Sequence, residues 1–135
     1  MKSALLDANV ILRYLTKDPP DMAEAAFKLF RKASQGEINL VIPLIVVAEV
    51  VWVLESFYNF PKARIAETIG DFLICDGLSV DQLDLMLDAL TIYQKKNLDF
   101  VDALISMTAL RQGPLFVYSF DRHFDRVEGI KRLEP

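Results

Sequence analysis

The stretch from Asn39 to Leu54, NLVIPLIVVAEVVWVL, decides the fold. Pro43 divides it: the apolar residues before it predict a buried strand, and proline is favoured at the first position of a helix because no N–H is needed there. The segment that follows, residues 44–58, is rich in valine, which suits a strand, but its length favours a buried helix. The apolar run contains Glu49 and is shorter than the ~20 residues of a membrane-spanning helix. We therefore expect a buried strand that leads directly into a buried helix.

Strands and helices alternate along the whole chain. The expected strands are residues 4–6, 39–42, 78–80, 115–118 and 130–133, and the expected helices are residues 10–15, 22–34, 44–58, 61–75, 82–95 and 99–110. This alternation predicts a parallel sheet covered by helices on both faces, which is a three-layer α/β/α sandwich. A length of 135 residues fits one domain over residues 1–135.

The composition excludes several classes of protein. Hydrophobic residues make up 53% of the chain and charged residues 25%, which excludes a disordered protein. The net charge of −4 argues against a nucleic-acid binder held by basic patches alone, but not against a nuclease with an acidic site. The single cysteine, Cys75, allows no intrachain disulfide and fits a cytoplasmic protein. The apolar stretch at the N-terminus is broken by Asp7, so we expect no signal peptide.

Four carboxylates occupy positions where a carboxylate is costly. Asp7 and Asp121 each follow an expected strand, and parallel strands deliver such residues to one edge of the sheet. Glu49 is the only charge in the apolar stretch, and Asp102 lies near the start of an otherwise apolar helix segment. Partly buried carboxylates that gather in one place repel each other unless a cation neutralises them. The sequence therefore predicts that these four residues bind metal.

The donor set indicates which metal to expect. Carboxylate oxygens suit Mg²⁺ or Mn²⁺, whereas one histidine and one cysteine cannot form a structural zinc site. Four acids suffice for one or two ions. Such ions lower the pKa of a bound water and neutralise charge on a phosphate, so the predicted chemistry is hydrolysis at a phosphate.

Four short motifs carry a resemblance that covers essentially the whole chain. They are Leu6 to Val10 (LDANV), Ala48 to Val50 (AEV), Asp99 to Ile105 (DFVDALI) and Ser119 to Phe124 (SFDRHF). In order and spacing the sequence resembles the PIN-domain ribonucleases, and among them the VapC-type toxins of VapBC toxin–antitoxin systems.

The resemblance implies a function for the acids. Asp7, Glu49 and Asp102 match the core metal-binding acids of this family, and Asp121 matches a more variable fourth one. Asn9 and Ser119 match polar positions that support the site. The resemblance further implies Mg²⁺- or Mn²⁺-dependent cleavage of RNA, a homodimer, and inhibition by a cognate antitoxin.

Each residue also has a structural interpretation. Asp99 is better explained as the N-cap of the helix that follows than as a metal-site residue. Asn9 suits a turn, and Asp121 suits the cap of a short helix. The single histidine, His123, is interpreted as a loop or solvent-facing residue, because a metal-activated water does not require it as a base.

Basic residues near the expected site have two interpretations. Arg13, Lys17 and Arg122 either contact RNA phosphates or belong to a solvated face.

Two other functions stay open. The first is a phosphotransferase or phosphatase with an aspartyl nucleophile, but haloacid-dehalogenase-like enzymes require a second aspartate at the position of Asn9. The second is a PIN-fold interaction module that binds an antitoxin and has weak or no catalysis. The complete set of acids argues against such a module.

Overall fold

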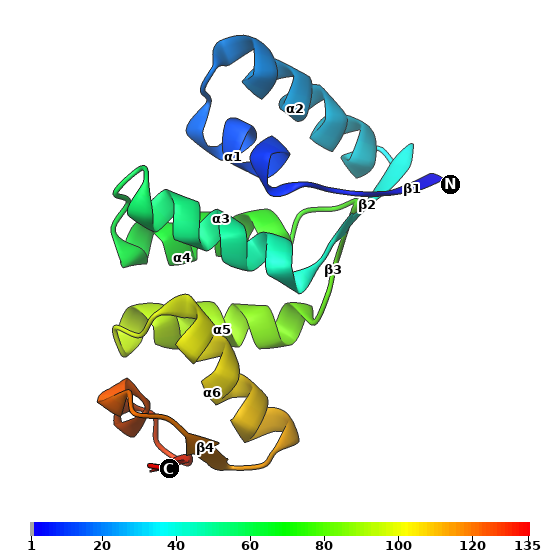
Figure 1. Ribbon diagram of the computed structural model, residues 1–135. Helices are drawn as coiled ribbons and strands as arrows, with labels where there is room; N and C mark the ends of the chain where they lie inside the picture. The colour runs from blue at the N-terminus through cyan, green and yellow to red at the C-terminus, as the bar shows by residue number, and fades with distance from the viewer. Residues whose placement is uncertain (1) are drawn as a thin grey trace. The chain divides into compact units, whose positions relative to one another are not determined.

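A computed structural model describes residues 2–135, which divide into two compact units, Met1–Leu83 and Asp84–Pro135. Both units are drawn in Figure 1. The prediction that residues 1–135 form a single domain stays a prediction.

The Met1–Leu83 unit contains three strands and four helices among its described residues. They are β1 (Lys2–Leu5), α1 (Ala8–Thr16), α2 (Pro20–Ser34), β2 (Ile38–Ile42), α3 (Leu44–Ser56), α4 (Lys62–Leu73) and β3 (Leu78–Val80). All three strands pair in parallel, in the order β1-β2-β3. The central strand, β2, carries the buried residues Leu40 and Ile42. The first half of the apolar stretch thus forms the centre of this sheet.

The second half of the stretch forms α3, as predicted. Pro43 is its N-cap residue, and the Pro43 carbonyl accepts hydrogen bonds from the first free N–H groups of the helix. One face of α3 is fully buried and consists of Val47, Val50, Val51 and Leu54. The β-branched residues are compatible with the helix because burial of this face outweighs their weak preference for strands.

The other helices of this unit pack around α3 and the sheet. α1 contacts α2 and α3, α3 contacts α4, and α2 contacts β2. Tyr14, Phe30 and Phe72 join α1, α2 and α4 through ring contacts, with the Phe30 and Phe72 centroids 5.2 Å apart. Such aromatic pairs stabilise the packing by about 0.5–1.5 kcal/mol each beyond their burial.

The Asp84–Pro135 unit contains α5 (Leu83–Lys95), which begins at its boundary, α6 (Phe100–Gln112), β4 (Phe116–Tyr118), the 3-10 helix η1 (Arg122–Arg126) and β5 (Lys131–Leu133). The two strands pair in parallel, so each of the observed strand pairs in the described part of the chain is parallel. Tyr93 on α5 is fully buried and meets Phe100 on α6 edge to face. Arg126 holds η1 against the α5–α6 turn by donating to the carbonyl of Asn97 at 2.6 Å.

Parallel strands that alternate with six helices confirm the predicted α/β/α class. One detail differs from expectation, and one is left untested. β1 was expected to be buried, but Leu5 is 75% exposed, because β1 is an edge strand and, among the described residues, pairs with β2 on one side only; burial begins at Leu6. The shared sheet edge for Asp7 and Asp121 also stays a prediction, because β1 and β4 belong to different sheets.

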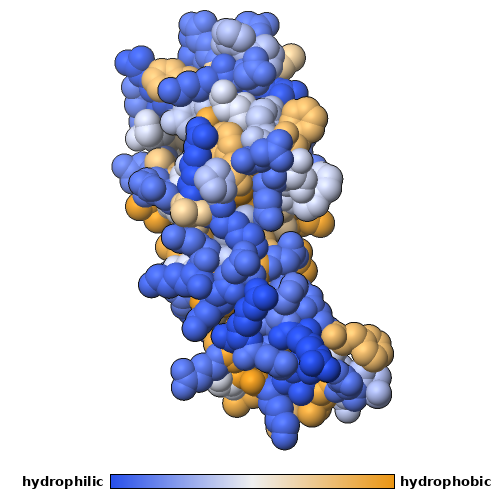
Figure 2. Space-filling model, turned by 90° about the vertical axis from the view of Figure 1, so that its left-hand side faces the viewer, coloured by the Kyte–Doolittle hydropathy of each residue, from blue (hydrophilic) through white to orange (hydrophobic). Residues whose placement is uncertain are grey.

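The surface and the helices add one observation each. On the face drawn in Figure 2, hydrophobic residues form separate spots among hydrophilic ones. Among the described residues, no helix combines the length and the apolar character needed to cross a membrane.

Candidate metal centre

Asp7 lies where the chain leaves β1 and enters α1. It is the N-cap residue of α1, and its carboxylate accepts a hydrogen bond from the N–H of Ala8 at 2.8 Å. The positive end of the helix dipole favours a negative charge here. The carboxylate is exposed, so Asp7 is stable at this position without a metal.

Glu49 lies on the exposed side of α3, opposite the valines that face the core. The expectation that all four carboxylates are partly buried is therefore wrong for Asp7 and Glu49. An apolar sequence around an acid signals a buried helix, but the 3.6-residue period still turns one position per turn outward, and Glu49 occupies it.

Asn9 follows Asp7 on the first turn of α1. It lines an apolar groove of about 460 Å³ between α1 and α2, together with Arg13 one turn later and Met22 on α2. Arg13 thus lines the same groove as Asn9, which is two positions after Asp7 in the sequence. The contact of Arg13 with RNA phosphates stays a prediction, beside the alternative that Arg13 belongs to a solvated face.

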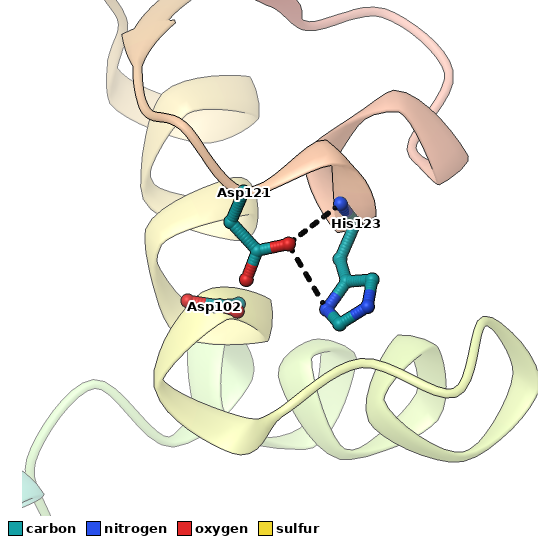
Figure 3. A group of neighbouring side chains, drawn as sticks. All are labelled: Asp102, Asp121 and His123. Carbon is teal, nitrogen blue, oxygen red and sulfur yellow. Dashed lines mark hydrogen bonds and ion pairs between the residues drawn. The ribbon is translucent and has the colours of Figure 1, made fainter.

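Asp102, Asp121 and His123 form a cluster in the Asp84–Pro135 unit (Figure 3). Asp102 lies in the first turn of α6, and Asp121 is the N-cap residue of η1. One ligand atom from each of the three side chains lies within 4.8 Å of the others. Two acids from the predicted set are therefore neighbours, although 18 residues lie between them in the sequence.

His123 contacts Asp121 Oδ1 twice, through a backbone hydrogen bond and through an ion-pair contact of its ring. The backbone N–H of His123 lies 2.8 Å away, and the ring nitrogen Nδ1 lies 3.1 Å away. The first of these contacts is the expected cap of a short helix. The second places the imidazole beside the carboxylate, on the side drawn in Figure 3.

The electrostatics of the cluster are unfavourable for a second negative charge. Burial raises the pKa of Asp102, and the negative charges of Asp99 and Asp121 raise it further, against a smaller opposite effect of His123. A carboxyl group that ionises reluctantly beside another carboxylate requires a proton or a cation.

Ser119 supports Asp121 through the backbone. Its hydroxyl oxygen accepts a hydrogen bond from the N–H of Asp121 at 2.9 Å, and its own carbonyl accepts one from Arg132 at 3.0 Å. Arg132 also pairs with Asp125 and Glu134, which raises the pKa of its guanidinium. Asp125 is thus engaged by Arg132.

Asp99 occupies the N-cap position of α6, as expected, but its side chain makes no capping hydrogen bond. Instead its charge acts on Asp102. Asp99 is therefore an electrostatic neighbour of the cluster.

The structure brings together Asp102 and Asp121 with Ser119, and it adds His123, which the sequence interpretation had assigned to a loop or to solvent. One sequence feature points to this contact. His123 lies two residues after Asp121, and a capping aspartate accepts a hydrogen bond from the backbone N–H at that position. Asp7 caps α1 and Glu49 lies on α3, and these two helices contact each other. The gathering of Asp7 and Glu49 with Asp102 and Asp121 stays a prediction.

The donor set of the cluster fits a divalent cation. Two carboxylates and one imidazole are ligands that Mn²⁺ accepts, and a cation between Asp102 and Asp121 would remove the repulsion that raises the Asp102 pKa.

Comparison with known proteins agrees with the sequence motifs. The PIN domain family model matches residues 4–130. The chain belongs to the PIN-domain family. It is also 30% identical over 131 residues to a protein called VapC ribonuclease from Aquifex aeolicus (strain VF5), a match that covers 97% of this chain and 96% of that relative. The predicted resemblance to VapC-type PIN proteins is thereby confirmed.

Proposed function

We propose that this protein is a metal-dependent endoribonuclease and the toxin of a type II toxin–antitoxin pair. One structural observation supports the metal part of this proposal: Asp102 and Asp121 converge with their ligand atoms within 4.8 Å in a site where ionisation of Asp102 is disfavoured. Family membership and the VapC relative support the ribonuclease part.

Asp102 and Asp121 would hold the ion, with Asp7 and Glu49 as the further ligands that the family resemblance implies. When bound, Mg²⁺ or Mn²⁺ would neutralise charge on the phosphate and make a bound water acidic enough to act as nucleophile near neutral pH.

The chain's own residues orient the site. Ser119 fixes the backbone of Asp121, and the N–H of His123 fixes one oxygen of its carboxylate. The second oxygen of Asp121 points toward Asp102 in Figure 3. Asp121 is therefore held in one orientation before an ion binds, which reduces the entropy lost on binding.

We also propose the partners implied by the family. They are an RNA substrate, a cognate antitoxin that inhibits cleavage, and a second copy of this chain in a homodimer. We propose a cytoplasmic location, consistent with the exposed free thiol of Cys75.

The deciding experiment is cleavage of RNA by antitoxin-free protein with Mg²⁺, with Mn²⁺ and with a chelator. Cleavage is expected only with metal, and Asp7→Ala should abolish it. Absence of cleavage by the wild-type protein, or full cleavage by Asp7→Ala, would overturn the proposal. A protein that cleaves no RNA, with or without metal, but binds the antitoxin tightly would favour the interaction module.

A further inference from the structure

We propose that His123 is a direct metal ligand, so that Asp102, Asp121 and His123 form a mixed oxygen–nitrogen centre that prefers manganese over magnesium. This inference rests on the proposed function, because it concerns the same metal site. It adds a ligand that is not one of the four acids and assigns the site a preference between metals.

The local backbone places the imidazole ring of His123 beside Asp121. η1 begins directly after Asp121, and the first turn brings the N–H of His123 to Asp121 Oδ1 at 2.8 Å. With the backbone anchored there, the imidazole Nδ1 lies 3.1 Å from the same carboxylate oxygen. The position of His123 beside Asp121 is therefore set by the helix cap.

The distances between the three ligand atoms are close to those around a single ion. Ions of this kind hold oxygen ligands at roughly 2.1 Å, so adjacent ligands at a right angle are about 3 Å apart and opposite ligands about 4.2 Å apart. The 3.1 Å separation of Nδ1 and Oδ1 matches adjacent ligands. The 4.8 Å limit within which all three ligand atoms lie is slightly wider than the larger distance. A small inward movement of side chains would suffice for all three to bind one ion.

The negative charge of the cluster favours a neutral side chain as the third ligand. Asp102 and Asp121 already supply two negative charges, and Asp99 adds a third nearby. A neutral imidazole adds a ligand without further repulsion. The His123 side chain is 50% exposed, so its ring has room to turn toward an ion.

An imidazole ligand also affects whether the site prefers Mn²⁺ or Mg²⁺. Imidazole nitrogen is a softer ligand than carboxylate oxygen, and Mg²⁺ prefers hard oxygen ligands. A site that includes His123 should therefore lose more Mn²⁺ affinity than Mg²⁺ affinity when the ring is removed. A ring that only orients Asp121 would affect the two ions equally.

The test uses tag-free protein of residues 1–135, in which His123 is the single histidine. Electron spin-echo envelope modulation of the Mn²⁺-loaded wild type should show a directly coordinated ¹⁴N, and ¹⁵N-histidine labelling should change that signal to the ¹⁵N pattern. Because the wild-type protein is measured, this readout does not depend on the folding of a variant. Manganese bound without imidazole nitrogen, or binding of Mg²⁺ alone, would overturn the inference and leave the proposed function intact, whereas absence of binding of either ion would overturn both.

Isothermal titration provides the second readout. His123→Gln should weaken Mn²⁺ binding by about 10-fold and Mg²⁺ binding by less than about 3-fold. The control is Glu128→Gln, an exposed residue two positions after η1, which should change neither. Equal losses for both ions in His123→Gln would reduce His123 to a positioning residue and overturn the inference.

Discussion

The acids of the two units are in opposite electrostatic situations. In the Met1–Leu83 unit, Asp7 is exposed, caps α1 and receives the N–H of Ala8, while Glu49 faces solvent on α3. In the Asp84–Pro135 unit, Asp102 and Asp121 face each other, and burial with neighbouring negative charge raises the pKa of Asp102. The comparison teaches that sequence position alone does not make an acid dependent on metal. A capping carboxylate is stable by itself, whereas clustered carboxylates require a cation or a proton.

The largest expected effect is loss of catalysis in Asp102→Asn. This change keeps the shape of the side chain and removes a charged ligand, so RNA cleavage should fall by more than about 100-fold, since even indirect supports of a metal site cost 10- to 100-fold. The measurement is the cleavage rate with saturating Mn²⁺.

Asp84→Asn is the matched control for Asp102→Asn. Asp84 and Asp102 both lie in the first turn of a helix, so both substitutions remove the same favourable interaction with the helix dipole. Only Asp102 belongs to the cluster. Equal rates for the two variants would contradict a catalytic role for Asp102.

The next effect is stabilisation by metal, which decides whether the two units share one site. At a hundred times its Kd, a bound ion stabilises the folded state by about 2.7 kcal/mol, which raises Tm by on the order of 10 °C. Asp102→Asn should lose most of this shift. Asp7→Asn should lose it as well if the four acids gather, and asparagine retains the N-cap of α1.

The measurement is thermal unfolding with and without Mn²⁺, with Asp21→Asn on α2 as the control in the same unit as Asp7. A full shift in Asp7→Asn would confine the metal to the Asp102–Asp121–His123 cluster. A wild-type melting curve that does not respond to saturating metal would contradict the clustering of the acids altogether.

Much of this comparison could be predicted from the sequence. Asn39 to Leu54 predicted β2 and α3, because a strand, a proline and a long apolar segment permit few other folds. Asp121 as a helix cap and Asp102 in a first helical turn followed from local rules that depend on few neighbours. These features depend on local sequence, and they were correct.

The features that depend on tertiary contacts could not be predicted in the same way. The exposure of Glu49 depends on which side of α3 meets the core, and an apolar sequence all around that helix conceals its outer face. The exposure of Leu5 depends on β1 being an edge strand. The role of His123 depends on the direction of a side chain in a 3-10 turn, which two residues of spacing do not determine.

A smaller effect is expected from Ser119→Ala, which tests how Asp121 is held. Without the hydroxyl, the N–H of Asp121 loses its acceptor at 2.9 Å, and the carboxylate gains freedom before metal binds. Mn²⁺ affinity should fall by about 10-fold, at the low end for a supporting residue of a metal site. Titration of the variant beside Ser34→Ala, an exposed serine at the end of α2, would separate this effect from loss of any hydroxyl. An unchanged Kd would show that the cap of η1 alone orients Asp121.

The smallest expected effect is a pH dependence of the metal-free protein. An acid with a higher pKa in the folded than in the unfolded state binds more protons when folded, so stability falls as pH rises from the ordinary aspartate value of 3.8 through the raised pKa of Asp102. Asp102→Asn carries no such charge, so with a chelator present its Tm at pH 7 should exceed that of Asp84→Asn. The difference should shrink as pH falls below 3.8, where the Asp102 carboxyl becomes protonated in both the folded and the unfolded state. A difference that persists well below pH 3.8 would point to packing as the cause. With saturating Mn²⁺ the order should reverse, because the carboxylate that destabilises the metal-free cluster is the one that binds the ion.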